Sequence, residues 1–131
     1  MHVKGMDHFT VLTNDLGATT AFYTEVLGLE NGYRPLEDLG VWLYAGGRAV
    51  LHVMADRPLP KERAGVLDHM AFTGIGLPEV VSKLRERNLK FDLRRQVKTR
   101  NWQLFFHDPN GAKVELDFSA DEAAPPGIAD G

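Results

Sequence analysis

Four side chains in this sequence have the types and the placing to bind a divalent metal ion. His8 and His69 each follow an aspartate, in "MDHFTV" and "LDHMAF", while His52 lies in "AVLHVM" and Glu115 in "KVELDF". Neutral imidazoles and a carboxylate suit Fe(II), Mn(II), Zn(II), Ni(II) and Co(II). Two histidines and one carboxylate with open coordination positions are the arrangement of many non-haem iron oxygenases. The four residues therefore indicate a metal site, provided that the fold brings them together.

Each of these residues also has a structural interpretation. A single histidine in a strand is more often a packed or surface residue than a ligand. Glu115 can simply point to solvent, because alternate residues of a strand face opposite sides of the sheet. A buried and unpaired carboxylate would be costly, so a metal or histidine partner is expected for Glu115 only if it is buried. The repeated Asp-His pair favours the metal interpretation, since the repeat itself predicts where the ligands lie.

The elements that must position these residues follow the same order twice. In the first half, Asn14 or Asp15 can cap a helix over 16–28, and Gly28 suits the left-handed position at its end. Strands of this half are expected at 5–13, 30–35, 40–46 and 49–54. A linker over 56–65, rich in proline and charge, then separates the two halves.

The second half repeats the β-α-β-β-β pattern. A helix is expected over 76–88, with Pro78 in its first turn. Strands are expected at 66–74, 90–96, 102–108 and 112–118. The remaining residues, 119–131, are acidic, small and proline-bearing, which is typical of a flexible tail. We therefore expect a single domain over 1–118, made of modules at about 5–55 and 66–118.

Pairing of the two modules is expected to bring the four candidate ligands close to one another. Each module alone exposes one face of a sheet, and pairing buries those faces. His8 and His69 are expected at equivalent places on the first strands. An alignment of the last strands by their ends puts His52 opposite Glu115. A pseudo-twofold axis would then bring all four side chains toward one centre.

The bulk composition narrows the class of protein. The chain has 131 residues, which fits one domain with a sizeable core. A net charge of −3 gives no overall positive field for nucleic acid. The absence of cysteine excludes disulfides, thiolate nucleophiles and Cys-based zinc sites. Since no apolar run approaches the roughly 20 residues of a membrane span, we expect a cytoplasmic protein that binds no membrane.

The stretches "MDHFTVLTNDL", "AFYTEVLGL", "LDHMAF" and "FFHDPNGAKVELDF" resemble the vicinal oxygen chelate superfamily. This superfamily includes glyoxalase I, fosfomycin-resistance and bleomycin-resistance proteins, and extradiol dioxygenases. The resemblance implies an α+β fold in which two tandem β-α-β-β-β modules form a curled mixed sheet around a divalent metal. It places His8, His69 and Glu115 on the usual ligand positions. His52 falls where glyoxalase I carries a glutamate that is both ligand and base.

Departures from the patterns of glyoxalase I and of fosfomycin-resistance proteins weaken an assignment to either subfamily. Histidine at position 52 differs from glyoxalase I. Thr10 resembles a substrate-contacting threonine of fosfomycin-resistance proteins, but Phe105 stands where those proteins have a tyrosine. The bleomycin-binding members of the superfamily bind no catalytic metal, so a metal-free binding protein is a separate alternative.

The resemblance implies a metal-dependent enzyme that acts on a small oxygen-bearing molecule. The three-ligand set with a nearby histidine favours dioxygenase-like chemistry slightly. The alternatives are a glyoxalase-like lyase or isomerase that works by metal-assisted proton transfer, with His52 or Glu115 as base, and a metal-free drug-binding resistance protein. His52 is assigned as a further ligand, a base or a structural residue. We also expect a homodimer, because modules of this kind complete their sheets by pairing within one chain or across two.

Overall fold

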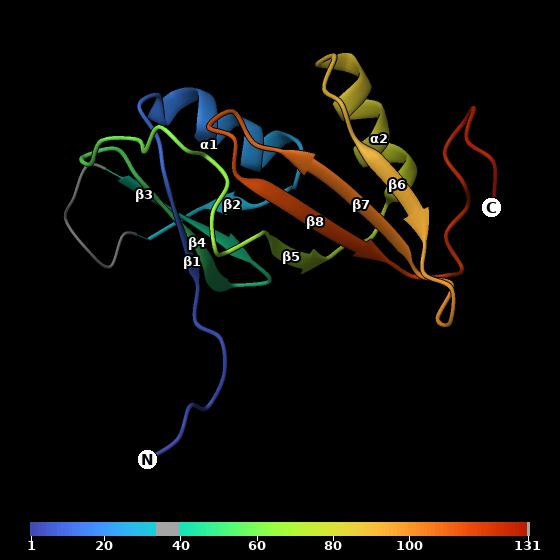
Figure 1. Cartoon of the computed structure of the whole chain (residues 1–131), viewed down its shortest axis with the longest axis horizontal. Coiled ribbons are helices and arrows are strands. Elements are labelled where there is room, and N and C mark those ends of the chain that lie inside the picture. The colour runs from blue at the N-terminus through green and yellow to red at the C-terminus, as the bar shows by residue number, and fades with distance from the viewer. Residues whose placement is uncertain (34–39, 131) are drawn as a thin grey trace. The chain divides into compact units, whose positions relative to one another are not determined.

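The computed structural model describes residues 1–33 and 40–130 of the chain (Figure 1). It divides into two compact units, Met1–Lys61 and Glu62–Gly131, and each is described by itself. Each unit holds one helix and a four-stranded mixed sheet in β-α-β-β-β order. The α+β class and the two tandem modules are therefore confirmed. No helix among residues 1–33 and 40–130 is long and apolar enough to cross a membrane.

The first unit contains β1 (Phe9–Leu12), α1 (Leu16–Glu25), β2 (Glu30–Asn31), β3 (Gly40–Ala45) and β4 (Arg48–Met54). Its strand order is β1-β4-β3-β2, and only the β1–β4 pair is parallel. The strand expected at 30–35 was too long: only Glu30–Asn31 form β2, residues 32 and 33 lie outside the strand, and residues 34–35 lie outside the described part of the chain.

Asp15, rather than Asn14, caps helix α1. Its carboxylate accepts a hydrogen bond from the backbone N–H of Ala18 at 3.0 Å. Gly28 has a φ of +73°, as expected for the left-handed position after a helix. The helix then packs against β3 and β4. Its buried side chains and those of the two strands form the core of this unit: Phe22, Tyr23, Val26, Leu43, Leu51 and Val53.

The second unit contains β5 (Met70–Thr73), α2 (Leu77–Glu86), β6 (Asp92–Arg95), β7 (Trp102–His107) and β8 (Lys113–Phe118). Its strand order is β5-β8-β7-β6, again with one parallel pair, β5–β8. One face of the sheet and one face of α2 supply the core: Leu77, Val81, Leu84, Leu104, Phe106, Leu116 and Phe118.

The two Asp-His pairs lie just before the first strands, not within them. Strand β1 begins at Phe9 and β5 at Met70, one residue after His8 and His69 respectively. The expected strands at 5–13 and 66–74 were therefore too long. The reason is that each first strand begins where its parallel ladder begins, with Phe9 opposite Leu51 and Met70 opposite its partner on β8.

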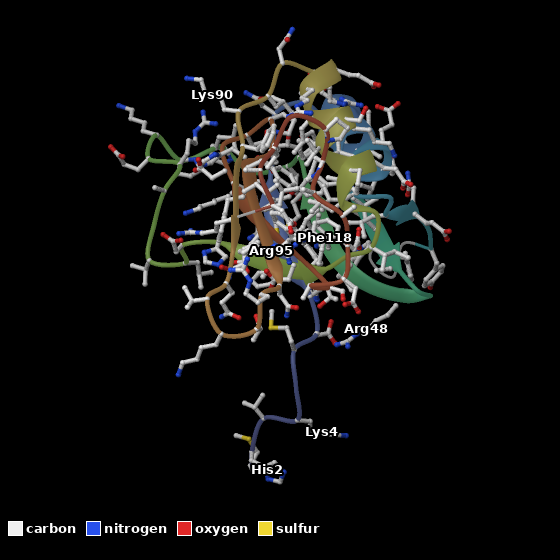
Figure 2. The ribbon with its side chains drawn as sticks, turned by 90° about the vertical axis from the view of Figure 1, so that its right-hand side faces the viewer. His2, Lys4, Arg48, Lys90, Arg95 and Phe118 are labelled. Carbon is white, nitrogen blue, oxygen red and sulfur yellow. The ribbon has the colours of Figure 1, made fainter. Side chains whose placement is uncertain are left out.

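Residues 119–130, which the sequence assigns to a flexible tail, make several hydrogen bonds within the second unit. The segment runs beside β6 in Figure 1, and Arg95, labelled in Figure 2, binds the Asp130 carboxylate at 2.6 Å. Trp102 donates its indole N–H to the backbone oxygen of Glu122 at 2.9 Å. The Glu122 carboxylate accepts the backbone N–H groups of Gly76 and Leu77 at 2.7–3.1 Å. Gly76 has no side chain to cap α2, so a residue 46 positions away caps it.

Replacing Glu122 by alanine is expected to lower the free energy of unfolding by about 1–2 kcal/mol, because two N–H groups at a helix start lose their acceptor. The control is Asp121→Ala, which removes an exposed neighbouring carboxylate and should change stability by less than about 0.5 kcal/mol. Urea titration followed by circular dichroism measures both. Equal effects of the two changes would contradict a capping role for Glu122.

Candidate active site

The strand registers give His52 and Glu115 equivalent places in their sheets. On β4, His52 lies opposite Trp42 of β3. On β8, Glu115 lies opposite Phe105 of β7. The parallel ladders agree. The residue before His52 pairs with the first residue of β1, and the residue before Glu115 pairs with the first residue of β5. The alignment made from the sequence is therefore confirmed as a register equivalence, and Trp42 and Phe105 are equivalent in the same way.

In the second unit, His69 is placed between two carboxylates. Its Nε2 lies 2.9 Å from Oε1 of Glu115, and its Nδ1 lies 2.7 Å from Oδ2 of Asp68. Glu115 is only 7% exposed, so the histidine partner expected for a buried carboxylate is present. The hydrogen bond from His69, followed by the charge of Lys113, lowers the pKa of Asp68 from its usual value. These contacts bring two of the candidate ligands together.

The first unit repeats the Asp-His contact. Nδ1 of His8 lies 2.7 Å from Oδ1 of Asp7, as it does for His69 and Asp68 in the second unit. A carboxylate that binds Nδ1 fixes the ring so that Nε2 is the nitrogen left to bind another group. Metal-binding histidines are commonly oriented by a carboxylate in this manner. The repeated aspartates therefore have a physical role that fits a pair of imidazole ligands.

His52 lies in an aromatic cluster with His8 and Trp42. Its ring stacks on Trp42 with centroids 4.2 Å apart and an interplanar angle of 8°. His8 meets the same indole edge-on at 4.6 Å, and the two imidazole centroids are 6.3 Å apart. His52 is 3% exposed, whereas the His8 side chain keeps 29% of its surface. The fold of this unit therefore groups its two candidate ligands around one tryptophan.

Asp117 belongs to the site and was missed by the sequence analysis. It follows Glu115 by two residues on β8, which puts the two carboxyl groups on one face of the sheet. Burial, then the hydrogen bond and charge of Glu115, raise the pKa of Asp117 to about 6, and the charge of His69 opposes the shift. The alternation in "VELDF" was the signal that could have found it.

Two positive charges flank Phe105, the ring that meets His69 edge-on at 5.8 Å. The guanidinium of Arg94 lies 4.6 Å from the Phe105 centroid, and Nζ of Lys113 lies 5.2 Å from it. Lys113 also approaches the Asp68 carboxylate at 3.6 Å. The second unit thus places cations, carboxylates and an imidazole close to one aromatic ring.

The side chains present fit a divalent metal by their chemistry. Two imidazoles with supported Nδ1 atoms and a buried carboxylate are the donors that such ions prefer. Within residues 1–33 and 40–130, no three His, Asp or Glu side chains form a group arranged to hold a metal ion. The complete ligand set is therefore an expectation, supported by the pairs His8–His52 and His69–Glu115 inside their own units.

Comparison with known proteins identifies the family. A model of the Glyoxalase/Bleomycin resistance protein/Dioxygenase superfamily matches residues 5–116. Glyoxylase I 4 from Arabidopsis thaliana is 31% identical over 125 residues, which cover 88% of this chain and 71% of that protein.

Solved structures agree on the fold. The fosfomycin resistance protein FosX from Listeria monocytogenes has a TM-score of 0.70 at 20% identity, covering 90% of this chain and 95% of that one. A glyoxalase family protein from Enterococcus faecalis has a TM-score of 0.62 at 28% identity, covering 89% and 99%. The match over residues 5–116 and the β-α-β-β-β repeat lead to one conclusion: the chain belongs to the Glyoxalase/Bleomycin resistance protein/Dioxygenase superfamily.

Proposed function

We propose that this protein is a divalent-metal-dependent enzyme that acts on a small molecule with adjacent oxygen atoms. His8, His69 and Glu115 are the proposed ligands. The observation that carries the proposal is the contact of His69 with the buried Glu115, with Asp68 holding the other ring nitrogen. The repeated Asp7–His8 contact supports it. Family membership supports the same assignment, since the sequence resemblance implies that these residues fall on the family's usual ligand positions.

When bound, the metal would supply a Lewis acid that stabilises negative charge developing on a substrate oxygen. The chain's own residues have separate tasks. Asp7 and Asp68 hold the imidazoles of His8 and His69 in one orientation. His52, held flat against its neighbouring indole, is proposed as a further ligand or as the base that takes a proton at an imidazole nitrogen.

Oxidative cleavage by a dioxygenase-like reaction is the first candidate reaction. Two histidines and one carboxylate are the ligands of many iron enzymes that leave positions open for substrate and dioxygen. Metal-assisted proton transfer is the second, and the similarity to a protein named Glyoxylase I 4 favours it. The alternative that is not an enzyme is a metal-free protein that binds a drug.

Metal analysis of the purified protein tests the proposal and separates these classes. About one divalent ion per chain, lost on chelation together with catalytic activity, is the expected result. A protein that binds its small molecule equally well before and after chelation would contradict the proposal and favour the drug-binding alternative.

We further propose that the protein forms a homodimer. Strands β1 and β2 are the outer strands of one sheet, and β5 and β6 those of the other. Outer strands present unpaired backbone groups that invite association. Sedimentation velocity should therefore show a species of twice the 14.6 kDa chain mass at micromolar concentration. A monomer that still binds metal would count against the dimer.

A further inference from the structure

The indole N–H of Trp42 is a buried hydrogen-bond donor with no acceptor among the residues that the structure describes. Trp42 is 5% exposed. The second tryptophan, Trp102, is buried to a similar extent, but its N–H donates to the Glu122 backbone oxygen at 2.9 Å. Buried donors are normally paired, because an unpaired one loses its hydration without compensation. An acceptor for the Trp42 N–H is therefore expected from outside the described residues.

The surroundings of Trp42 point to a ligand as that acceptor. Its ring contacts both candidate metal-binding residues of the first unit, His8 edge-on and His52 face-on. The equivalent place in the second unit is occupied by Phe105, which contacts His69 in the same edge-on manner but has no N–H. The aromatic contact to a histidine is thus common to both modules, whereas the donor is present in only one.

We propose that the Trp42 indole N–H donates a hydrogen bond to an oxygen atom of the bound substrate. This inference rests on the proposed function, because it places the substrate beside the proposed ligands. Trp42 would then be a specificity residue: a molecule with an acceptor oxygen at this place completes the donor's hydrogen bonding. A molecule that offers a methyl group there leaves the donor unpaired and is rejected.

The indole N–H resonances provide a direct test. Acetohydroxamate, a small chelator with two adjacent oxygens, is titrated into zinc-loaded, ¹⁵N-labelled protein. The chain has two tryptophans, so two indole N–H resonances are expected, and Trp42→Phe assigns them. We expect the Trp42 resonance to move downfield as it gains an acceptor, while that of Trp102 stays in place because its bond is already formed. An unmoved Trp42 resonance at saturating acetohydroxamate would overturn the inference.

Affinity measurements give a second readout that does not depend on an activity assay. Trp42→Phe keeps an aromatic ring beside His52 and imitates the natural Phe105 of the other module, so zinc content should be unchanged. Acetohydroxamate affinity should fall about tenfold, the usual effect of one lost hydrogen bond. Unchanged affinity would contradict the inference alone. Wild-type protein that binds no zinc, or zinc-loaded protein that ignores acetohydroxamate, would contradict the proposed function and this inference with it.

Discussion

Replacing His69 by alanine is expected to remove most of the bound metal while leaving the fold intact. The imidazole is one of three or four proposed ligands. Loss of a residue that merely orients a ligand typically lowers metal affinity about 10–100-fold, so loss of a ligand itself should cost at least that much. The His69 side chain is 31% exposed and precedes β5, so its removal opens no cavity in the core.

The structural consequence that matters most for stability concerns the buried Glu115. The buried carboxylate loses its 2.9 Å contact with the imidazole, so the metal-free variant should be somewhat less stable than the metal-free wild type. His107→Ala is the matched control, because His107 is an exposed histidine at the end of β7 in the same sheet. Metal content is measured per chain, and folding by circular dichroism. Full metal occupancy in His69→Ala would exclude the residue as a ligand.

The features that sequence could predict are those with a local cause. Hydrophobic periodicity predicted the helix over 76–88, and end signals predicted the helix over 16–28. Asp15 was one of two candidate caps because only short polar side chains reach the first N–H groups. The equivalence of His52 and Glu115 was also predictable, because the two modules repeat the same order and end on similar strands.

The features that sequence could not predict depend on residues far apart in the chain. The Glu122 carboxylate caps α2 from a segment whose composition is typical of disorder, and composition does not show which distant N–H group needs an acceptor. The first strands begin only after His8 and His69, because the parallel partner strand sets the boundary. The stacking of Trp42 on His52 follows from strand register. Register can be predicted from a sequence only when the ends of both strands are known.

Replacing His52 distinguishes three roles for this residue, because each role predicts a different effect of the replacement. A fourth ligand would contribute to metal affinity. A base would affect turnover and leave metal binding nearly intact. A packing residue would affect stability alone. We expect a role as ligand or base, because His52 is equivalent to Glu115 in register and shares the indole of Trp42 with His8.

Two variants, His52→Ala and His52→Gln, distinguish the roles. Alanine removes a buried ring that is stacked on an indole, so it should lower the free energy of unfolding by about 1–3 kcal/mol whatever the role. Glutamine keeps much of the volume and can offer an oxygen to a metal, but it takes up no proton near neutral pH. The exposed His107, changed to alanine and to glutamine in parallel, controls for effects of the substitutions themselves.

The pattern of metal content and turnover then decides the role of His52. Metal lost in His52→Ala but kept in His52→Gln supports a ligand. Metal kept in both, with turnover reduced about 10²–10⁴-fold in both, supports a base, since that is the usual contribution of a positioned general base. If both variants keep metal and turnover and differ from the wild type only in melting temperature, then His52 is structural. In that case its equivalence with Glu115 is one of register only, and the proposed role as ligand or base is wrong.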